Sequence, residues 1–378
     1  MSGVSDQAGC GRTFGLFGAP DRTYREFVEN IWSRICAGMR MPCSEADAAW
    51  RELTGMLGTW ADDPMGTQCA VPSYVSADGF PAEFSLSWKR ERGEARILFE
   101  SPAGSAKESQ EAGRNLTRRL ADERGVSIER FLKVEDLFLA ESPVPYRPTV
   151  WHSLAWERGT GPQYKVYLNP QAQGAEHAFE IVSEAMGRLE LETGWKRVAA
   201  RAAELRAAGH ELEFFALDLG SDRAARAKVY FRHGPMCLSD MAGVAAMARS
   251  HDADRAAAVC RTIYGPDTTE VHNEPMTCLT FRQDSDEPEE ANLYLRLPDN
   301  APDDEEASRR IATAMRAEGL DADIYLDTVR DLCPRPLKAT SGLQELLSYR
   351  TLAPGVPADI GVYLRLSTYD APPGGRPG

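Results

Sequence analysis

Segments of this chain follow one repeated order, in which a helical stretch leads to two strand-like stretches and then to another helical stretch. Strand pairs separated by helices favour an antiparallel sheet with its helices on one face. Ten strands without an obviously protected edge favour closure of that sheet into a barrel. The predicted strands, five pairs in all, cover 83–88, 95–101, 149–156, 163–169, 211–219, 226–233, 277–282, 292–297, 346–351 and 360–368.

Helical patterns fill the intervals between the strand pairs. We therefore expect an α+β fold, a ten-stranded antiparallel β-barrel ringed by α-helices, as a single domain over 21–370. A flexible N-terminus at 1–20 and a disordered, Pro- and Gly-rich tail at 371–378 would flank it. A barrel of more than about eight strands leaves a lumen wide enough for a ligand. The predicted helices cover 22–38, 44–57, 107–123, 127–138, 174–190, 194–207, 238–248, 252–263 and 304–318.

Polar and apolar residues alternate along the second strand of each pair, so that one face of each strand is apolar. The polar faces carry an unusual set, which comprises Arg96, Lys165 with Tyr167, Arg226 with Lys228 and Tyr230, Asn292 with Tyr294, and Tyr363 with Arg365. These faces could meet water, as in any half-exposed antiparallel sheet. If helices cover the outside of a closed barrel, they line its lumen instead. Several cations in a lumen require a bound polyanion, and a diphosphate fits because Arg and Lys bind its oxygens.

One carboxylate lies on a polar face of the first predicted strand. Glu83 shares that face with Ser85 and Ser87, while the residues between them are apolar. A carboxylate in a lumen among cations could serve as their ion-pair partner. It could equally accept a hydrogen bond from a substrate N–H group.

The charge balance limits the partners of this chain. With 57 acidic against 43 basic residues, the formal net charge is −14, which argues against a nucleic-acid or anionic-membrane binder. No apolar run approaches the ~18 residues of a membrane span, and the N-terminus shows no secretory signal pattern. We therefore expect a cytoplasmic monomer or homodimer whose partners are small molecules.

Nine short segments resemble, in order, those of the aromatic prenyltransferases of the dimethylallyltryptophan-synthase type, and especially their bacterial indole-prenylating members. The series spans roughly residues 70–370. That family folds as an αββα barrel of ten antiparallel strands, so the resemblance implies the fold that the strand count also favours. The segments are PAEFSL at 81–86, ARILFESP at 95–102, VEDLF at 134–138, YKVYLNP at 164–170, FFALDLG at 214–220, RAKVYFRH at 226–233, NLYL at 292–295, PRPL at 334–337 and VYLRLSTY at 362–369.

The resemblance implies a role for individual residues. Glu83 would accept the indole N–H, and His152 would lie near the indole ring, where it either removes the ring proton or is structural. Asn292, where many relatives have Gln, and Arg365 would face the lumen. The diphosphate-binding cations would be Arg96, Lys165, Arg226 and Lys228, and the tyrosines that shield an allylic cation would be Tyr167, Tyr230, Tyr294, Tyr363 and Tyr369.

The implied reaction is a Friedel–Crafts alkylation, in which dimethylallyl diphosphate donates its prenyl group to the indole of L-tryptophan or of a tryptophan-derived metabolite. No DDxxD motif is present, the nearest acidic runs being at 61–65 and 302–306. We therefore expect no cofactor and no requirement for Mg²⁺. A tryptophan-containing cyclic dipeptide, an indolactam, or a tyrosine or other phenol remains open as the acceptor. A non-catalytic isoprenoid-binding barrel is the alternative from another class.

Overall fold

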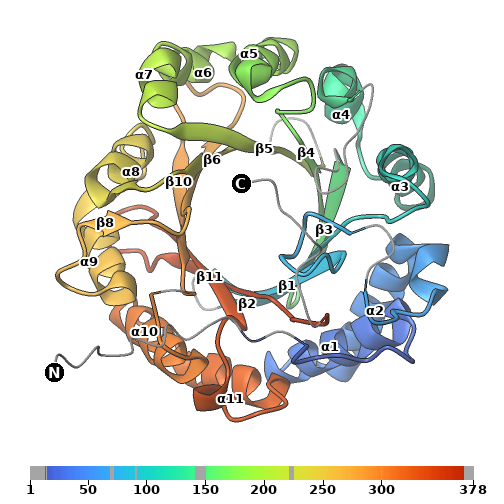
Figure 1. The fold of residues 1–378 in the computed structure, drawn as a ribbon. Helices are drawn as coiled ribbons and strands as arrows, with labels where there is room; N and C mark the ends of the chain where they lie inside the picture. Colours follow the sequence, from blue (N-terminus) through green and yellow to red (C-terminus); the bar gives the residue numbers. More distant parts are fainter. Residues whose placement is uncertain are drawn as a thin grey trace, which may run out of the picture.

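A closed β-barrel forms the centre of the molecule, and helices surround it (Figure 1). The computed structural model describes residues 15–68, 72–89, 92–140, 150–220, 225–298 and 300–369, together with residue 13. Ten strands in these ranges pair antiparallel in the order β1-β12-β11-β10-β9-β6-β5-β4-β3-β2, which confirms the predicted fold class. They are β1 Ala82–Lys89, β2 Arg92–Phe99, β3 Val150–Glu157, β4 Gly161–Leu168, β5 His210–Leu219, β6 Ala227–His233, β9 Met276–Phe281, β10 Glu290–Arg296, β11 Gln344–Arg350 and β12 Asp359–Leu364.

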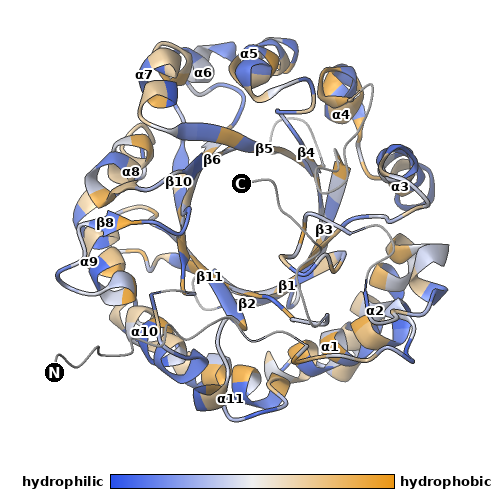
Figure 2. Cartoon of the chain, viewed as in Figure 1, coloured by the Kyte–Doolittle hydropathy of each residue, from blue (hydrophilic) through white to orange (hydrophobic). Residues whose placement is uncertain are grey.

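The helices form a layer between the barrel and solvent. None of them, within the described ranges, is both long and apolar enough to cross a membrane. Figure 2 shows that each carries polar as well as apolar residues, which suits this position. They are α1 Tyr24–Gly38, α2 Cys43–Leu57, α3 Ala106–Arg124, α4 Glu129–Val134, α5 Ala178–Arg188, α6 Glu192–Ala199, α7 Ala202–Ala207, α8 Leu238–Ala245, α9 Ala253–Tyr264, α10 Asp304–Ala317 and α11 Ala322–Leu332.

Several elements differ from the predictions. The predicted helix at 127–138 is α4 followed by a 3₁₀ turn, and the one at 194–207 divides into α6 and α7. Helix α11 was not predicted, although Asp321 caps it and Tyr325, Val329 and Leu332 bury one face at helical spacing. A small sheet of β7 Met236–Cys237 and β8 Glu270–Val271 was also missed, because two-residue strands have no periodicity.

The ends of the predicted domain fall partly outside the described residues. Of the segment predicted to be flexible, residues 13 and 15–20 are described, and there Leu16 is buried. The amides of Gly15 and Phe17 donate hydrogen bonds to the carbonyls of Tyr369 and Ser367. Residues 1–12 and the tail at 371–378 lie outside the described residues, so their predicted disorder stays a prediction.

Apolar side chains on the outer face of the barrel form the main core. In β6, Ala227, Val229 and Phe231 are fully buried against the helix layer. In α1, Phe27, Ile31 and other residues at helical spacing are buried from the opposite side. The apolar half of each strand is therefore used for packing, and the polar half is left to face the lumen.

The N-terminus of α10 offers a test of local stability. The side chain of Asp303 accepts a hydrogen bond of 2.8 Å from the amide of Glu306. We expect Asp303→Ala to lower the free energy of unfolding by about 1 kcal/mol, measured by urea denaturation, because an N-terminal amide loses its partner. Asp303→Asn, which keeps the acceptor oxygen, should stay close to the parent protein. An equal loss in both variants would contradict this account.

Candidate active site

The lumen contains a cavity of about 300 Å³ that is lined by side chains from all ten strands. A smaller cavity adjoins it, and the two share Arg96, Lys165 and four tyrosines as lining residues. The polar strand faces therefore line a cavity inside the barrel, and they do not form its outer surface. Of the two alternatives for the polar strand faces, contact with water outside the sheet or lining of a barrel lumen, the structure shows the second.

Cations are concentrated around the smaller cavity. The four predicted cations are brought together there, although they come from β2, β4 and β6 and, for Arg226, from the position just before β6. Two more were not predicted, and both extend the alternation of their strands, Lys89 after Ser87 and Arg350 after Ser348. In full, the cationic side chains of the described residues that line this end of the lumen are Lys89, Arg96, Lys165, Arg226, Lys228 and Arg350.

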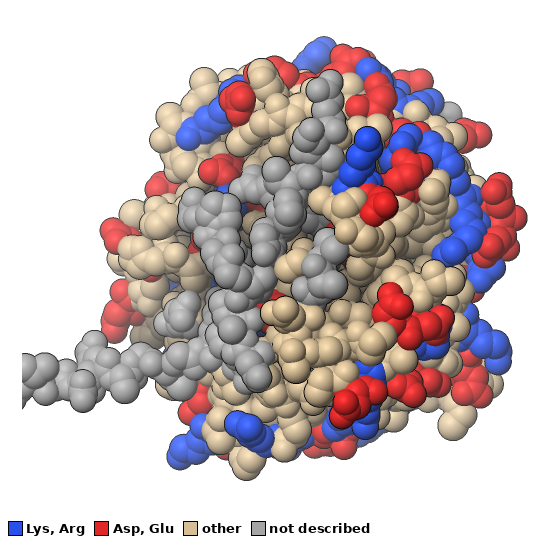
Figure 3. Space-filling view, turned by 45° about the vertical axis from the view of Figure 1, so that its right-hand side comes forward, with Lys and Arg blue, Asp and Glu red and all other residues tan. Residues whose placement is uncertain are grey.

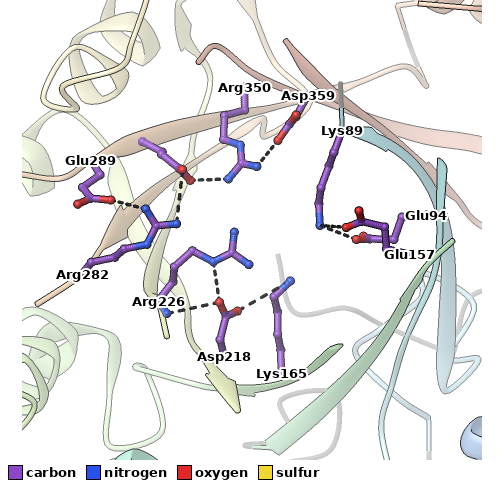
Figure 4. A network of polar contacts seen from close by, with 11 residues as sticks. Lys89, Glu94, Glu157, Lys165, Asp218, Arg226, Arg282, Glu289, Arg350 and Asp359 are labelled. Atoms are coloured by element: carbon purple, nitrogen blue, oxygen red, sulfur yellow. Dashed lines mark hydrogen bonds and ion pairs between the residues drawn. The ribbon is translucent and has the colours of Figure 1, made fainter. Parts of the chain in front are cut away.

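Carboxylates hold most of these cations in place (Figure 4). Asp218 on β5 lies between two of them, with Oδ2 2.6 Å from Nε of Arg226 and Oδ1 4.0 Å from Nζ of Lys165. Glu94 on β2 pairs with both Lys89, at 2.5 Å, and Arg96. Burial alone would raise the pKa of Glu94, but these two cations outweigh it and lower the pKa to about 2.

The same pattern continues on the far side of the smaller cavity, where Arg350 pairs with Glu290 and Asp359. The exception is Lys228, which has no ion pair among the described residues. Burial, followed by the nearby charge of Arg226, lowers its pKa to about 8.

Four tyrosines form a continuous row across the lumen between the two cavities. The ring centroids of Tyr167 and Tyr230 lie 6.0 Å apart, those of Tyr230 and Tyr294 5.7 Å, and those of Tyr294 and Tyr363 5.7 Å. Burial raises the pKa of all four hydroxyls, so they stay protonated. Asn292 supports the row, since its amide nitrogen donates to the hydroxyl of Tyr294 at 3.1 Å.

Glu83 lies in the larger cavity, on the other side of the tyrosine row from most of the cations. Aromatic and apolar side chains, among them Trp151 and Phe214, surround the space it faces. Burial, followed by the negative charge of Glu345, raises the pKa of Glu83 to about 8. Aromatic rings and charged side chains together line this cavity, and Glu83 provides a carboxyl group in it that can accept a hydrogen bond.

The prediction that His152 lies near the reacting ring is wrong. Its neighbours Trp151 and Ser153 line the cavity, whereas His152 is fully buried on the outer face of β3. There Nε2 is 2.8 Å from the hydroxyl of Thr117 on α3, and the ring packs against Phe99. Burial lowers its pKa to about 3, and the residue is structural.

Tyr369 is also outside the lumen, which corrects its prediction as a shield residue. It lies beyond the end of β12, where its hydroxyl is 2.9 Å from that of Tyr24 on α1 and its ring packs against Phe80. Arg365, by contrast, lines the larger cavity as predicted, with Nε 3.7 Å from a carboxylate oxygen of Glu345.

The carboxylates of the described residues do not gather into a metal site. No group of three or more His, Cys, Asp or Glu side chains among them could hold a metal ion. The acidic run at 61–65 includes Asp62, which pairs with Arg25 on the protein surface. The run at 302–306 forms the N-terminus of α10.

Comparisons with known proteins agree with this geometry. A family model described as tryptophan dimethylallyltransferase matches residues 52–328. The crystal structure of 5-dimethylallyl tryptophan synthase from Streptomyces coelicolor, in complex with DMASPP and Trp, is 25% identical, with a TM-score of 0.83 over 94% of this chain and 98% of that one. The crystal structure of 6-dimethylallyltryptophan synthase from Micromonospora olivasterospora, in complex with the same two ligands, is 29% identical, with a TM-score of 0.84 over 93% of this chain and 100% of that one. AnaPT from Neosartorya fischeri, at 15% identity and a TM-score of 0.74, shares the fold.

Proposed function

Because this chain belongs to the tryptophan dimethylallyltransferase family, we propose that it transfers the dimethylallyl group of dimethylallyl diphosphate to the indole ring of L-tryptophan. The arrangement of the lumen carries this proposal. Cations line one end, four tyrosines cross the middle, and Glu83 lies in the cavity at the other end, which Trp151 and Phe214 also line. The cations suit an anionic leaving group, the tyrosines suit an allylic cation, and Glu83 suits the N–H group of an indole.

The cations would stabilise the leaving group. As the C–O bond of the donor breaks, negative charge develops on the diphosphate, and fixed positive charges nearby lower the barrier most effectively. Arg96, Lys165, Arg226 and Lys228 are the proposed ligands, and Lys89 and Arg350 add to the same field. Because these side chains supply the positive charge, we propose that the reaction requires neither Mg²⁺ nor another cofactor.

The tyrosines would protect the allylic cation. Rings of Tyr167, Tyr230, Tyr294 and Tyr363 stabilise a cation by cation–π attraction and keep water from its carbon atoms. Glu83 would accept the indole N–H and so hold the ring facing the cation. A carbon–carbon bond then forms, and the loss of a ring proton restores aromaticity.

The tyrosine row can be tested through the fate of the cation. We expect Tyr294→Ala to release more dimethylallyl alcohol relative to prenylated tryptophan, because Tyr294 joins the two halves of the row. Tyr294→Phe, which keeps the ring, is the matched control and should retain the parent ratio. Both products can be quantified by mass spectrometry. Unchanged ratios in both variants would argue against a shielding role.

The activity itself is tested by incubating the protein with dimethylallyl diphosphate and a panel of acceptors, with and without EDTA. The panel contains L-tryptophan, tryptophan cyclic dipeptides, an indolactam and tyrosine, and products are characterised by mass and NMR. Prenylated tryptophan formed in the presence of EDTA is the expected result. No prenylated product from any acceptor would favour a non-catalytic isoprenoid-binding barrel, although its lumen should be apolar, unlike this one.

We also propose that the partners of the protein are small molecules only, and that it works in the cytoplasm as a monomer or homodimer. Acidic and basic side chains are interspersed on the face shown in Figure 3, and no broad basic area is visible there. Together with the net charge of −14, this surface does not suit a nucleic-acid backbone.

A further inference from the structure

A short loop before β1 contributes to the wall of the larger cavity. We call residues 73–79 the cavity loop, because the four residues at 74–77 all line that cavity. The amide of Ser73 donates to the carbonyl of Gly79 at 2.9 Å, and the amide of Gly79 donates to the carbonyl of Ser76 at 3.0 Å, so the loop closes on itself. None of its residues belongs to a strand of the barrel.

Asp78 fastens the cavity loop to a distant part of the chain. The residue is 3% exposed, and each of its carboxylate oxygens accepts hydrogen bonds from a different segment. On the loop side, Oδ1 accepts from the hydroxyl of Ser76 at 2.7 Å and from the amide of Phe80 at 3.2 Å. On the other side, Oδ2 accepts from the amide and the hydroxyl of Thr368, at 2.7 and 3.0 Å, and from the amide of Tyr369 at 3.2 Å.

The segment after β12 gives Asp78 a fixed support. Strands β1 and β12 pair antiparallel, so the chain enters β1 and leaves β12 at the same end of the barrel. There the amides of Gly15 and Phe17 donate to the carbonyls of Tyr369 and Ser367, at 3.0 and 2.8 Å. Because other parts of the chain also hold this segment, we expect a loss of the contacts at Asp78 to displace the loop rather than the segment.

The position of the cavity loop depends on these contacts more than the position of the strands does. Each strand of the barrel pairs with a neighbour on both edges, whereas the loop is outside the sheet. Segments held by few bonds open at a low cost in free energy. If the loop moved outward, a compact acceptor would lose contacts with side chains such as Val75 and Ala77, and a bulky acceptor would gain room.

We propose that Asp78 is a positioning residue, which holds the cavity loop in place and thereby limits the size of the indole acceptor. This inference rests on the proposed function and adds to it the residue that sets acceptor size. Asp78 lines neither lumen cavity, so it acts through the residues at 74–77. In Asp78→Asn, an amide that donates would replace one of the two accepting oxygens, so the donors on one side would lose their acceptor.

The test is a competition between two acceptors that differ in size. Equimolar L-tryptophan and the cyclic dipeptide of two L-tryptophan residues are incubated together with dimethylallyl diphosphate, and both products are quantified by mass spectrometry. The product ratio reports relative kcat/KM and does not depend on the amount of folded enzyme. We expect Asp78→Asn to raise the ratio of prenylated dipeptide to prenylated tryptophan at least tenfold, or from no detectable dipeptide product to a measurable amount.

A second variant tests the other side of the same contact. Thr368→Val keeps the shape of the side chain and both backbone amides but removes the hydroxyl that donates to Asp78. We expect it to raise the product ratio in the same direction, by about two- to fivefold. Thr368 lines neither cavity, so the change does not alter the acceptor site directly. This variant also carries the test if Asp78→Asn does not fold.

Asp304 on α10 supplies a matched control. It is 1% exposed and accepts hydrogen bonds from the amides of Leu343 and Gln344, at 3.3 and 3.2 Å. It also lines neither cavity, but it supports β11, which the closed sheet holds on both edges. Asp304→Asn should therefore leave the product ratio at the parent value. Affinity for inorganic diphosphate, measured by calorimetry, should be the same in Asp78→Asn and the parent, because the cations line the opposite end of the lumen.

The outcomes separate the inference from the proposed function. An unchanged product ratio in Asp78→Asn and Thr368→Val would overturn the inference, and so would a shift towards L-tryptophan. A rise of equal size in Asp304→Asn would also overturn it, because any loosening of the fold would then be sufficient. If the parent protein prenylates neither acceptor, the proposed function itself fails.

Discussion

Replacement of Glu83 by Gln should lower kcat/KM for L-tryptophan about 100-fold at pH 8, because a carboxylate beside the indole stabilises the positive charge that develops on the ring as it attacks. Gln keeps an acceptor oxygen for the N–H but carries no charge. Burial of Glu83 limits the solvent that could take the place of that charge. Steady-state kinetics with saturating donor would measure the loss.

The pH profile gives this prediction a second readout. Burial and Glu345 raise the pKa of Glu83 to about 8, so the ionised form becomes more abundant as pH rises through 8. The activity of the parent enzyme should therefore rise as the pH increases from 7 to about 8, and Glu83→Gln should lose that rise. Below pH 7 most of the carboxyl is protonated, and the two proteins should differ less.

Glu100 supplies the matched control for Glu83. It is also buried, its pKa is also raised to about 8 by burial, and Ser73 donates a hydrogen bond to it at 2.5 Å. Unlike Glu83, it does not line either lumen cavity. Glu100→Gln should leave the pH profile unchanged. An identical loss in both variants would show that the effect is on the fold.

Replacement of Lys228 by Ala should weaken the binding of inorganic diphosphate ten- to a hundredfold, the ~1.5–3 kcal/mol expected for a hydrogen bond to a charged group. Lys228 is buried, lines the cation-rich cavity and has no ion pair among the described residues. Its charge is therefore the one least compensated in the unliganded protein. Isothermal titration calorimetry with diphosphate measures the change directly.

The same lysine should make diphosphate binding depend on pH. Its pKa is lowered to about 8, so the charged form is lost as pH rises through 8, and the affinity of the parent protein should fall with it. Lys228→Ala should show a weaker dependence. Lys107→Ala, an exposed lysine on α3, should match the parent at every pH. Equal affinities of Lys228→Ala and the parent would place the diphosphate elsewhere. The complete reaction needs ionised Glu83, which is gained as pH rises, and charged Lys228, which is lost. Its rate should therefore depend on pH with a bell-shaped profile.

The alternation of polar and apolar residues predicted most of the residues that line the lumen. The same alternation also shows why the prediction for His152 was wrong. In 149–156, His152 shares a face with Leu154 and Trp156, and that is the outer face of the barrel. Strict use of the alternation would therefore have excluded His152, which the family resemblance favoured. Lys89 and Arg350 could likewise have been found by extending the alternation to the ends of their strands.

Other features were beyond the reach of alternation. The bulge at Glu345 shifts the phase of β11, and strict alternation cannot show which residue is extra. The pairing of Asp218 with Lys165 and Arg226 depends on the register of three strands, which no local pattern specifies. The family resemblance implied a place in the lumen for Tyr369, but β12 ends at Leu364, and the alternation of inward and outward side chains ends with the strand.

The two faces of each barrel strand have separate roles, and the residues that serve them alternate along the chain. Outward side chains such as Val229 and Phe231 specify the fit to the helices, whereas inward ones such as Lys228 and Tyr230 specify the chemistry. Because the closed wall holds every strand on both edges, changes to one set need not disturb the other. A library that varies only inward positions, exchanging paired charges together, should therefore yield enzymes with new acceptors at little cost in folding.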